Sequence, residues 1–125
     1  MAKAKLKEIK WLPDVEEHDY PAAESYLRIL YSEDSVAKMI SRLRSAAIVQ
    51  FKAKDLFRAS QLSLLGVSNL HVEKDRYKIL EGIGLSPLLL VRDSQNGKVV
   101  IADGYHRLCA IYGFDEDALI PCKIV

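Results

Sequence analysis

Two almost uninterrupted apolar runs near the C-terminal end of the chain constrain its fold more than any other feature. They are PLLLVRD (87–93) and KVVIAD (98–103), and the SQNG between them contains Asn-Gly, a strong signal for a β-hairpin. Strands that stay apolar at consecutive positions are usually covered on both faces of their sheet. The sequence therefore predicts a β-hairpin that is covered on both sides.

The hairpin is followed by a helix and a final strand. In YHRLCAIYG, residues Leu108, Ile111 and Tyr112 recur at helical spacing, and Gly113 is the expected C-cap. ALIPCKIV (118–125) predicts a closing strand. Helices and strands mixed in this order predict an α+β (mixed α/β) domain, in which helices pack on a small mixed sheet.

The first 47 residues contain two helical patterns. Asp19 is a candidate N-cap with Pro21 in the first turn of one helix, and a second helix follows Ser32. The apolar positions of the two helices are Ala23, Tyr26, Leu27, Leu30, Val36, Met39, Ile40 and Leu43. We interpret residues 1–47 as an N-terminal extension that packs on a domain at residues 48–125, the whole forming one globular unit.

The pattern changes twice after these helices. Residues 48–51 (IVQF) favour an extended segment, from which Lys52 and Lys54 would project together just before Asp55. LFRASQLSLLG then predicts a short helix closed by Gly66.

A further helix is predicted in VSNLHVEKDRYKILEGIG, with Ser68 or Asn69 as its N-cap. Its apolar stripe consists of Val72, Ile79 and Ile83. His71 and Lys74 would lie in the first turn, close to backbone N–H groups that have no partner within the helix.

The composition excludes several classes of protein. The 125 residues carry a formal charge of +1, without the basic surplus of a dedicated nucleic-acid binder. No apolar run approaches the roughly 18 residues of a membrane span, and the N-terminus lacks a signal-peptide pattern. Cys109 and Cys122 have no metal or redox spacing, and Cys122 alternates with apolar residues as a buried side chain would. We expect a cytoplasmic protein with reduced thiols, no resident metal and no membrane contact.

The densest group of reactive side chains lies in ADGYHRLCA. A strand that ends in Asp-Gly and leads into a helix exposes the first N–H groups of that helix, which attract anions and phosphate above all. Gly104 permits a tight turn and a close approach by a ligand. Arg107 offers a planar fork of donors to phosphate oxygens, and His106 can donate a hydrogen bond or exchange a proton near neutrality.

Asp103 has several open roles in this segment. It can bind a divalent cation, act as a base, hold Arg107 or cap the helix. Asp-Gly before a helix is also common where there is only a turn and a cap. The residues alone therefore favour an anion site and a structural turn about equally.

ADGYHRLCA, placed between a β-hairpin and an amphipathic helix, resembles the signature of the ParB/sulfiredoxin superfamily. In particular, the chain resembles the small, stand-alone ParB-like proteins that carry DGYHR. The resemblance covers roughly residues 48–125, is specific around the motif and leaves out the first two helices. It implies a small mixed sheet packed with helices, here preceded by an N-terminal helical extension.

Matched position by position, the resemblance implies phosphate contact. Gly104 and Arg107 match the ParB box that holds a nucleoside triphosphate, but His106 and Cys109 replace two of its arginines. Sulfiredoxins carry GCHR, and their catalytic cysteine position is Tyr105 here, which excludes sulfiredoxin chemistry. Archaeal free-serine kinases carry a DGHHR-like motif, from which the chain departs only at Tyr105.

Four more polar residues are candidates to contact a phosphate group. These residues are Lys54, Asp55, His71 and Lys74. In the fold that the resemblance implies, the helix before the hairpin approaches the motif, so His71 or Lys74 would reach a second phosphate. A solvated surface position is the more common role for each lysine, and His71 fits helix capping equally well.

The leading hypothesis is a nucleotide- or phosphate-binding domain, either a small phosphotransferase or a nucleotide hydrolase. Gly104, Tyr105, His106 and Arg107 would contact phosphate, with Asp103 and His106 as catalytic residues. The expected ligands are ATP, ADP or CTP with magnesium, or a phosphorylated small molecule.

Two other functions remain as alternatives. One is a non-enzymatic ParB-type module that binds DNA or a protein. The formal charge of +1 argues against DNA as its ligand. The lysine-rich start AKAKLKEIK is then either a solvated tail or a weak phosphate-tracking arm. The other is a nuclease, which would need clustered carboxylates, and Asp103 has no assured partner in the sequence.

Overall fold

The computed structural model describes residues 8–63 and 69–125 of the chain. Its elements in chain order are α1 (Asp19–Leu30), α2 (Glu33–Ser45), β1 (Val49–Lys52), α3 (Ala53–Ser60), α4 (Leu70–Leu80), β2 (Leu88–Asp93), η1 (Ser94–Asn96), β3 (Lys98–Asp103), α5 (Tyr105–Phe114) and β4 (Leu119–Ile124). The predicted α+β class and the predicted order of helices and strands are confirmed.

The described strands form one four-stranded mixed sheet in the order β1-β4-β2-β3. β2 and β3 are the predicted hairpin, joined by η1 and by Gly97 in the left-handed conformation. β4 lies between β1 and β2, antiparallel to the first and parallel to the second. The last strand is therefore an interior strand, and β1 and β3 form the two edges.

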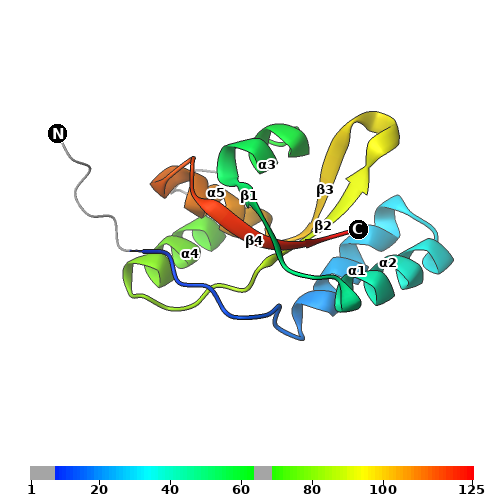
Figure 1. Cartoon of the computed structure of the whole chain (residues 1–125), viewed down its shortest axis with the longest axis horizontal. Coiled ribbons are helices and arrows are strands. Elements are labelled where there is room, and N and C mark those ends of the chain that lie inside the picture. Colours follow the sequence, from blue (N-terminus) through cyan, green and yellow to red (C-terminus); the bar gives the residue numbers. More distant parts are fainter. Residues whose placement is uncertain (1–7, 64–68) are drawn as a thin grey trace.

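Each face of the sheet has its own apolar core. Residues alternate along β2 and β3, so that Leu88, Leu90, Val99 and Ile101 belong to one core and Leu89, Val91, Val100 and Ala102 to the other. The first core includes buried residues of α3, α4 and α5, and the second includes buried residues of α1 and α2. Figure 1 shows α3 above the strands and α1 and α2 below them. The predicted cover on both sides of the hairpin is confirmed.

The start of α1 differs from the prediction. His18 occupies the N-cap position, so Asp19 is the first residue of the helix and not its cap. The Asp19 side chain is buried and contacts Ser86 and Arg107, which the sequence does not place near it. A residue interpreted as local capping thus makes a long-range contact.

The region around α3 also differs. β1 ends at Lys52 and α3 begins directly after it, so Lys54 lies on a helix and the two lysines do not share a strand face. Gln61, in the left-handed conformation, closes α3. Gly66 and Ser68, predicted as a helix end and a helix cap, lie outside the described residues.

Of the three other predicted helix ends, two agree with the structure. Ser32 caps α2, and Asn69 caps α4 by accepting from two N–H groups of its first turn. α5 runs through Gly113, and Asp115 is its C-cap, so that prediction is wrong. Residues predicted for apolar stripes but exposed in the structure are Tyr26, Leu30 and Ile83.

Cys109 and Cys122 are both buried and unpaired. Burial raises the pKa of the Cys122 thiol to about 12, which fits its predicted role as a small apolar side chain. Among residues 8–63 and 69–125, no helix is long and apolar enough to cross a membrane.

Candidate functional site

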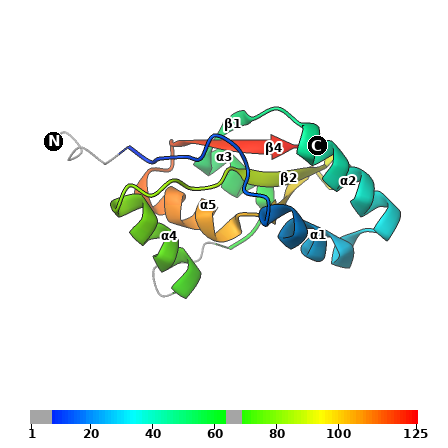
Figure 2. The same cartoon turned by 90° about the horizontal axis from the view of Figure 1, so that it is seen from below.

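The junction between β3 and α5 opens onto a pocket of about 300 Å³, which we call the polar pocket. It is lined by Glu16, His18, Asp19, His71, Lys74, Asp75, Lys78, Asp103, Gly104, His106 and Arg107. Its walls are the start of α1, one face of α4 and the first turn of α5. Figure 2 shows α5 between α4 and α1. The fold thus brings segments from three parts of the chain around the DGYHR motif.

Gly104 makes the turn from β3 into α5 possible. Its φ is +110°, a region that residues with a side chain rarely adopt. A Cβ at this position would lie 2.7 Å from Leu88 Cγ and 2.9 Å from Arg107 Nη2. The glycine is therefore required by the backbone and by two neighbouring side chains, one of which is the arginine of the motif.

The Arg107 side chain is 12% exposed and lies among acceptors. Its Nη2 donates to Asp103 Oδ2 at 2.6 Å, and its Nη1 donates to Asp19 Oδ2 at 3.2 Å and to the Ser86 carbonyl at 3.0 Å. Ser86 Oγ also donates to Asp19 Oδ2 at 2.5 Å. One guanidinium therefore joins two carboxylates that lie 84 positions apart in the chain (Asp19 and Asp103).

Asp103 is the titratable group that this arrangement perturbs most clearly. Burial raises its pKa to about 6, and the neighbouring Asp19 carboxylate adds to the rise, whereas Arg107 lowers it. A carboxyl group with this pKa exchanges a proton near neutral pH, as a general acid or base must.

Two histidines that line the pocket lie close together, with their ring planes tilted by 40°. The rings of His71 in α4 and His106 in α5 are 4.8 Å apart between centroids. Burial lowers the pKa of His106, and His71 lowers it further, while Asp75 opposes the shift. Burial also raises the pKa of Asp75, against the effect of Arg107 and Lys78. His106 is thus held in its neutral form, in which one ring nitrogen can accept a proton.

Two lysines of α4 supply positive charge to the pocket, and one of them, Lys78, also acts on the Asp75 carboxyl and lowers its pKa. Lys74 and Lys78 are exposed, line the pocket, and form no salt bridge with any residue in 8–63 or 69–125. The first turn of α5, on the opposite wall, has no side-chain cap. The backbone donors of α5 and the two ammonium groups therefore face one pocket, which suits an anion.

Six of the nine predicted site residues line this pocket, and three do not. The six are Asp103, Gly104, His106, Arg107, His71 and Lys74. Lys54 pairs with Asp117 at 2.7 Å, and Asp55 pairs with Arg58 at 3.6 Å, both away from the motif. Tyr105 lines a neighbouring hollow, where its hydroxyl donates to the Ser63 carbonyl.

Sequence reasoning missed several residues of the pocket. Asp75 and Lys78 carried a usable signal, because with His71 and Lys74 they occupy positions i, i+3, i+4 and i+7 of one helix face. No sequence signal marks Asp19 as a pocket residue, because the helix dipole alone explains an acidic residue at a helix start.

No group of three or more His, Cys, Asp or Glu residues that could hold a metal ion occurs in the part of the chain that the structure describes. Comparisons of the chain with protein-family models, with curated proteins and with solved structures find no match. The resemblance to the ParB/sulfiredoxin superfamily therefore stays a prediction, and function must be argued from the pocket itself.

Proposed function

We propose that this protein binds a nucleotide, or another ligand with a phosphate group, in the polar pocket and that Asp103 acts there as a general base. The observation that carries the proposal is that two lysines without a salt bridge to a described residue line the same pocket as a carboxyl group with a raised pKa. Lys74, Lys78, the first turn of α5 and Asp103 all line the pocket. The resemblance of the DGYHR motif to phosphate-binding motifs agrees with this reading.

Phosphate recognition is assigned to α4 and to the backbone of α5. An ammonium group on a flexible stem is a common phosphate ligand, and exposed Lys74 and Lys78 are free to move onto one. Arg107 has a different part, because both of its Nη atoms already donate to protein acceptors. It positions Asp103 and balances the buried negative charge.

Asp103 supplies the proton acceptor for phosphoryl transfer. It takes the proton of the attacking hydroxyl or water as that oxygen bonds to phosphorus and the bond to the leaving group breaks. Because the pKa of Asp103 is about 6, the acceptor form dominates above that pH. His106, whose pKa is lowered by burial, can take up or relay the same proton in its neutral form.

Magnesium, which accompanies most nucleotides, has a candidate ligand in Asp75. Mg²⁺ uses one or two protein carboxylates and completes its shell with phosphates and water. Asp19 and Asp103 are both bonded to Arg107, whereas Asp75 forms no salt bridge with a described residue. Bound there, the cation would neutralise charge on the phosphates.

Binding is tested by calorimetric titration of the full chain with ATP, ADP, CTP and GTP, with and without magnesium. We expect saturable binding of at least one nucleotide, and a loss of about tenfold in affinity for the Lys74→Gln/Lys78→Gln double variant. Lys38→Gln, an exposed lysine on α2, is the matched control and should leave affinity unchanged. Absence of binding at millimolar concentration for all four nucleotides would contradict the proposal.

Turnover is tested separately, by release of labelled phosphate or its transfer to a hydroxyl acceptor. The rate should rise with pH through about 6 and then level off, as Asp103 loses its proton. Asp103→Asn should abolish turnover and leave nucleotide affinity within a few-fold. Binding without turnover under any of these conditions would overturn the catalytic part and leave the binding part standing.

A further inference from the structure

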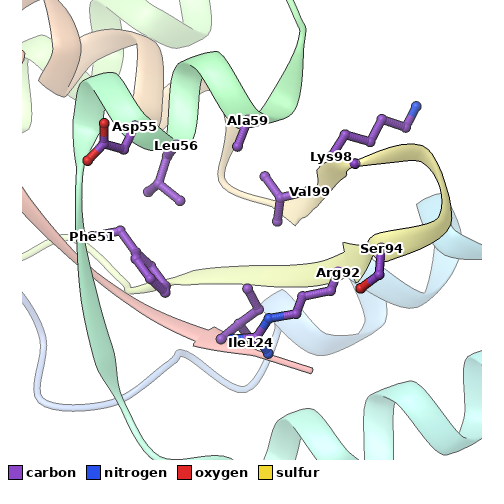
Figure 3. Close-up of a pocket in the computed structure, with 10 residues that line it drawn as sticks. Phe51, Asp55, Leu56, Ala59, Arg92, Ser94, Lys98, Val99 and Ile124 are labelled. Atoms are coloured by element: carbon purple, nitrogen blue, oxygen red, sulfur yellow. The ribbon is translucent and has the colours of Figure 1, made fainter.

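A second pocket of about 360 Å³ lies at the other end of β3, between α3 and the hairpin. Its floor is apolar and consists of Phe51, Leu56, Ala59, Val99 and Ile124 (Figure 3). We call it the apolar pocket. It shares no lining residue with the polar pocket.

The apolar pocket exists because α3 is short. With eight residues, α3 is only about 12 Å long and ends before it reaches the tip of the hairpin. After Gln61 the chain turns away, and the Ser63 carbonyl meets Tyr105 at the far end of β3. Phe51, Ala59 and Ile124 are only partly covered.

Positive charge stands on one side of this pocket. Arg92 lies directly across the hairpin from Val99, so both side chains leave the same face of the sheet. In Figure 3 the Arg92 side chain extends along the pocket toward Ile124, with Ser94 beside it, whereas Lys98 leaves the neighbouring strand and points away from Arg92. Neither Arg92 nor Lys98 forms an ion pair with any described residue.

The rim of the apolar pocket on the α3 side carries a negative charge. Asp55 lines the pocket on the α3 side, away from Arg92 (Figure 3). Its pair with Arg58 is long and exposed, so its negative charge is only weakly offset. An anionic group is therefore favoured at the Arg92 end and disfavoured at the Asp55 end.

We propose that the apolar pocket binds a small amphipathic monocarboxylate, with its carboxylate on Arg92 and its hydrocarbon tail over Phe51, Leu56 and Ala59. The planar guanidinium accepts a carboxylate in a two-point contact. The tail covers the apolar surface that α3 leaves open, which is the main favourable contribution to binding. This site is independent of the nucleotide proposal, because it uses no residue of the polar pocket.

The test is a titration of the isotope-labelled full chain with octanoate, followed by amide NMR shifts. We expect saturable shifts confined to residues around Phe51, Ala59 and Ile124. Octylamine should bind at least about tenfold more weakly, and octanedioate should also bind more weakly, because its second carboxylate lies toward Asp55. Octanol binding as tightly as octanoate, or no saturable shift at millimolar octanoate, would overturn the proposal.

Two variants locate the site. Arg92→Gln, an exposed position that leaves the fold intact, should weaken octanoate binding by at least about fivefold. Arg42→Gln on α2 is the matched control and should leave it within twofold. Ala59→Trp fills the pocket and should abolish the shifts in a protein whose circular dichroism is unchanged. Unaltered octanoate affinity in Arg92→Gln would place the carboxylate elsewhere and contradict the assignment.

Discussion

The two ends of β3 carry pockets of opposite construction. At Asp103 the strand leads into the polar pocket, where a mostly covered arginine joins two carboxylates from distant parts of the chain. At Lys98 the strand begins beside the apolar pocket, where an exposed arginine has no acidic partner among the described residues. The same residue type is thus part of the folded structure at one end and available to a ligand at the other.

This difference separates the cationic side chains that are part of the folded structure from those that are exposed to a ligand. A buried arginine with two carboxylate partners gains little by moving to a ligand, because its departure would leave negative charges unpaired in a poorly solvated place. Exposed Arg92, Lys74 and Lys78 lose only hydration when a ligand arrives. The motif arginine is therefore bound to carboxylates of the protein itself, and the cations that form no salt bridge with a described residue lie outside the motif.

The largest expected effect comes from removing Arg107. Arg107→Met should reduce the free energy of unfolding by about 3–5 kcal/mol, because it leaves Asp19 and Asp103 without their cation. Arg92→Met, at the apolar pocket, should change it by less than about 0.5 kcal/mol. Urea unfolding at pH 7 measures both. Equal effects of the two substitutions would remove the contrast between the pockets.

The next effect concerns the glycines at the two ends of the strand. Gly104→Ala should destabilise the protein by about 2–4 kcal/mol, because its Cβ would meet Leu88 and Arg107 at a φ of +110°. Gly97→Ala should cost about 1 kcal/mol, since that Cβ would meet nothing within 4 Å and only the backbone is strained. Thermal unfolding of both variants gives the comparison, and a smaller loss for Gly104→Ala would mean that the turn relaxes.

Asp103 should make stability depend on pH. Its pKa is raised from 3.8 to about 6 by folding, so the folded state binds more protons between these values and stability falls as pH rises from about 4 to 6. Above about pH 6 the raised pKa of Asp103 lowers the free energy of unfolding by its full amount, which is about 1–3 kcal/mol. Compared with wild type at pH 4 and pH 7, Asp103→Asn should remove this part of the pH dependence. A constant difference between the two proteins over that range would contradict the raised pKa.

The smallest effect is expected at two serines. Ser86 is buried, donates to Asp19 and accepts from the Glu16 N–H, so Ser86→Ala should cost about 1–2 kcal/mol. Ser94→Ala, at the rim of the apolar pocket, should be neutral within about 0.5 kcal/mol. Denaturant midpoints of the two variants decide this, and a neutral Ser86→Ala would show that Asp19 is held without the hydroxyl.

Local patterns predicted much of the fold. The hairpin followed from Asn-Gly between two apolar runs. A helix start after Ser32 and the cap Asn69 were also predicted, and both side chains bond to the first turn of their helix. The boundary errors occurred where another interaction replaced the local one. α5 ends at Phe114, one residue after Gly113, so Gly113 lies inside the helix. Asp19 bonds to Ser86 and Arg107 and does not cap α1.

The candidate site was predicted only in part for the same reason. The motif from Asp103 to Arg107 and the first-turn residues His71 and Lys74 were identified, because they are contiguous or start a helix. Lys54 was predicted to project from an extended segment just before Asp55, but the chain is helical there, and each of the two residues forms an ion pair away from the polar pocket.

By itself, the sequence determined which segments become most of the helices and strands. It also determined that the reactive residues lie where a strand ends and a helix begins. These features depend on residues within a few positions of one another. Only the tertiary structure decided that Asp19 meets Arg107, that α4 turns two lysines toward the motif, and that α3 stops short of the hairpin tip. Such contacts depend on how whole elements pack, because burial and charge pairing act between surfaces that meet only in the folded chain.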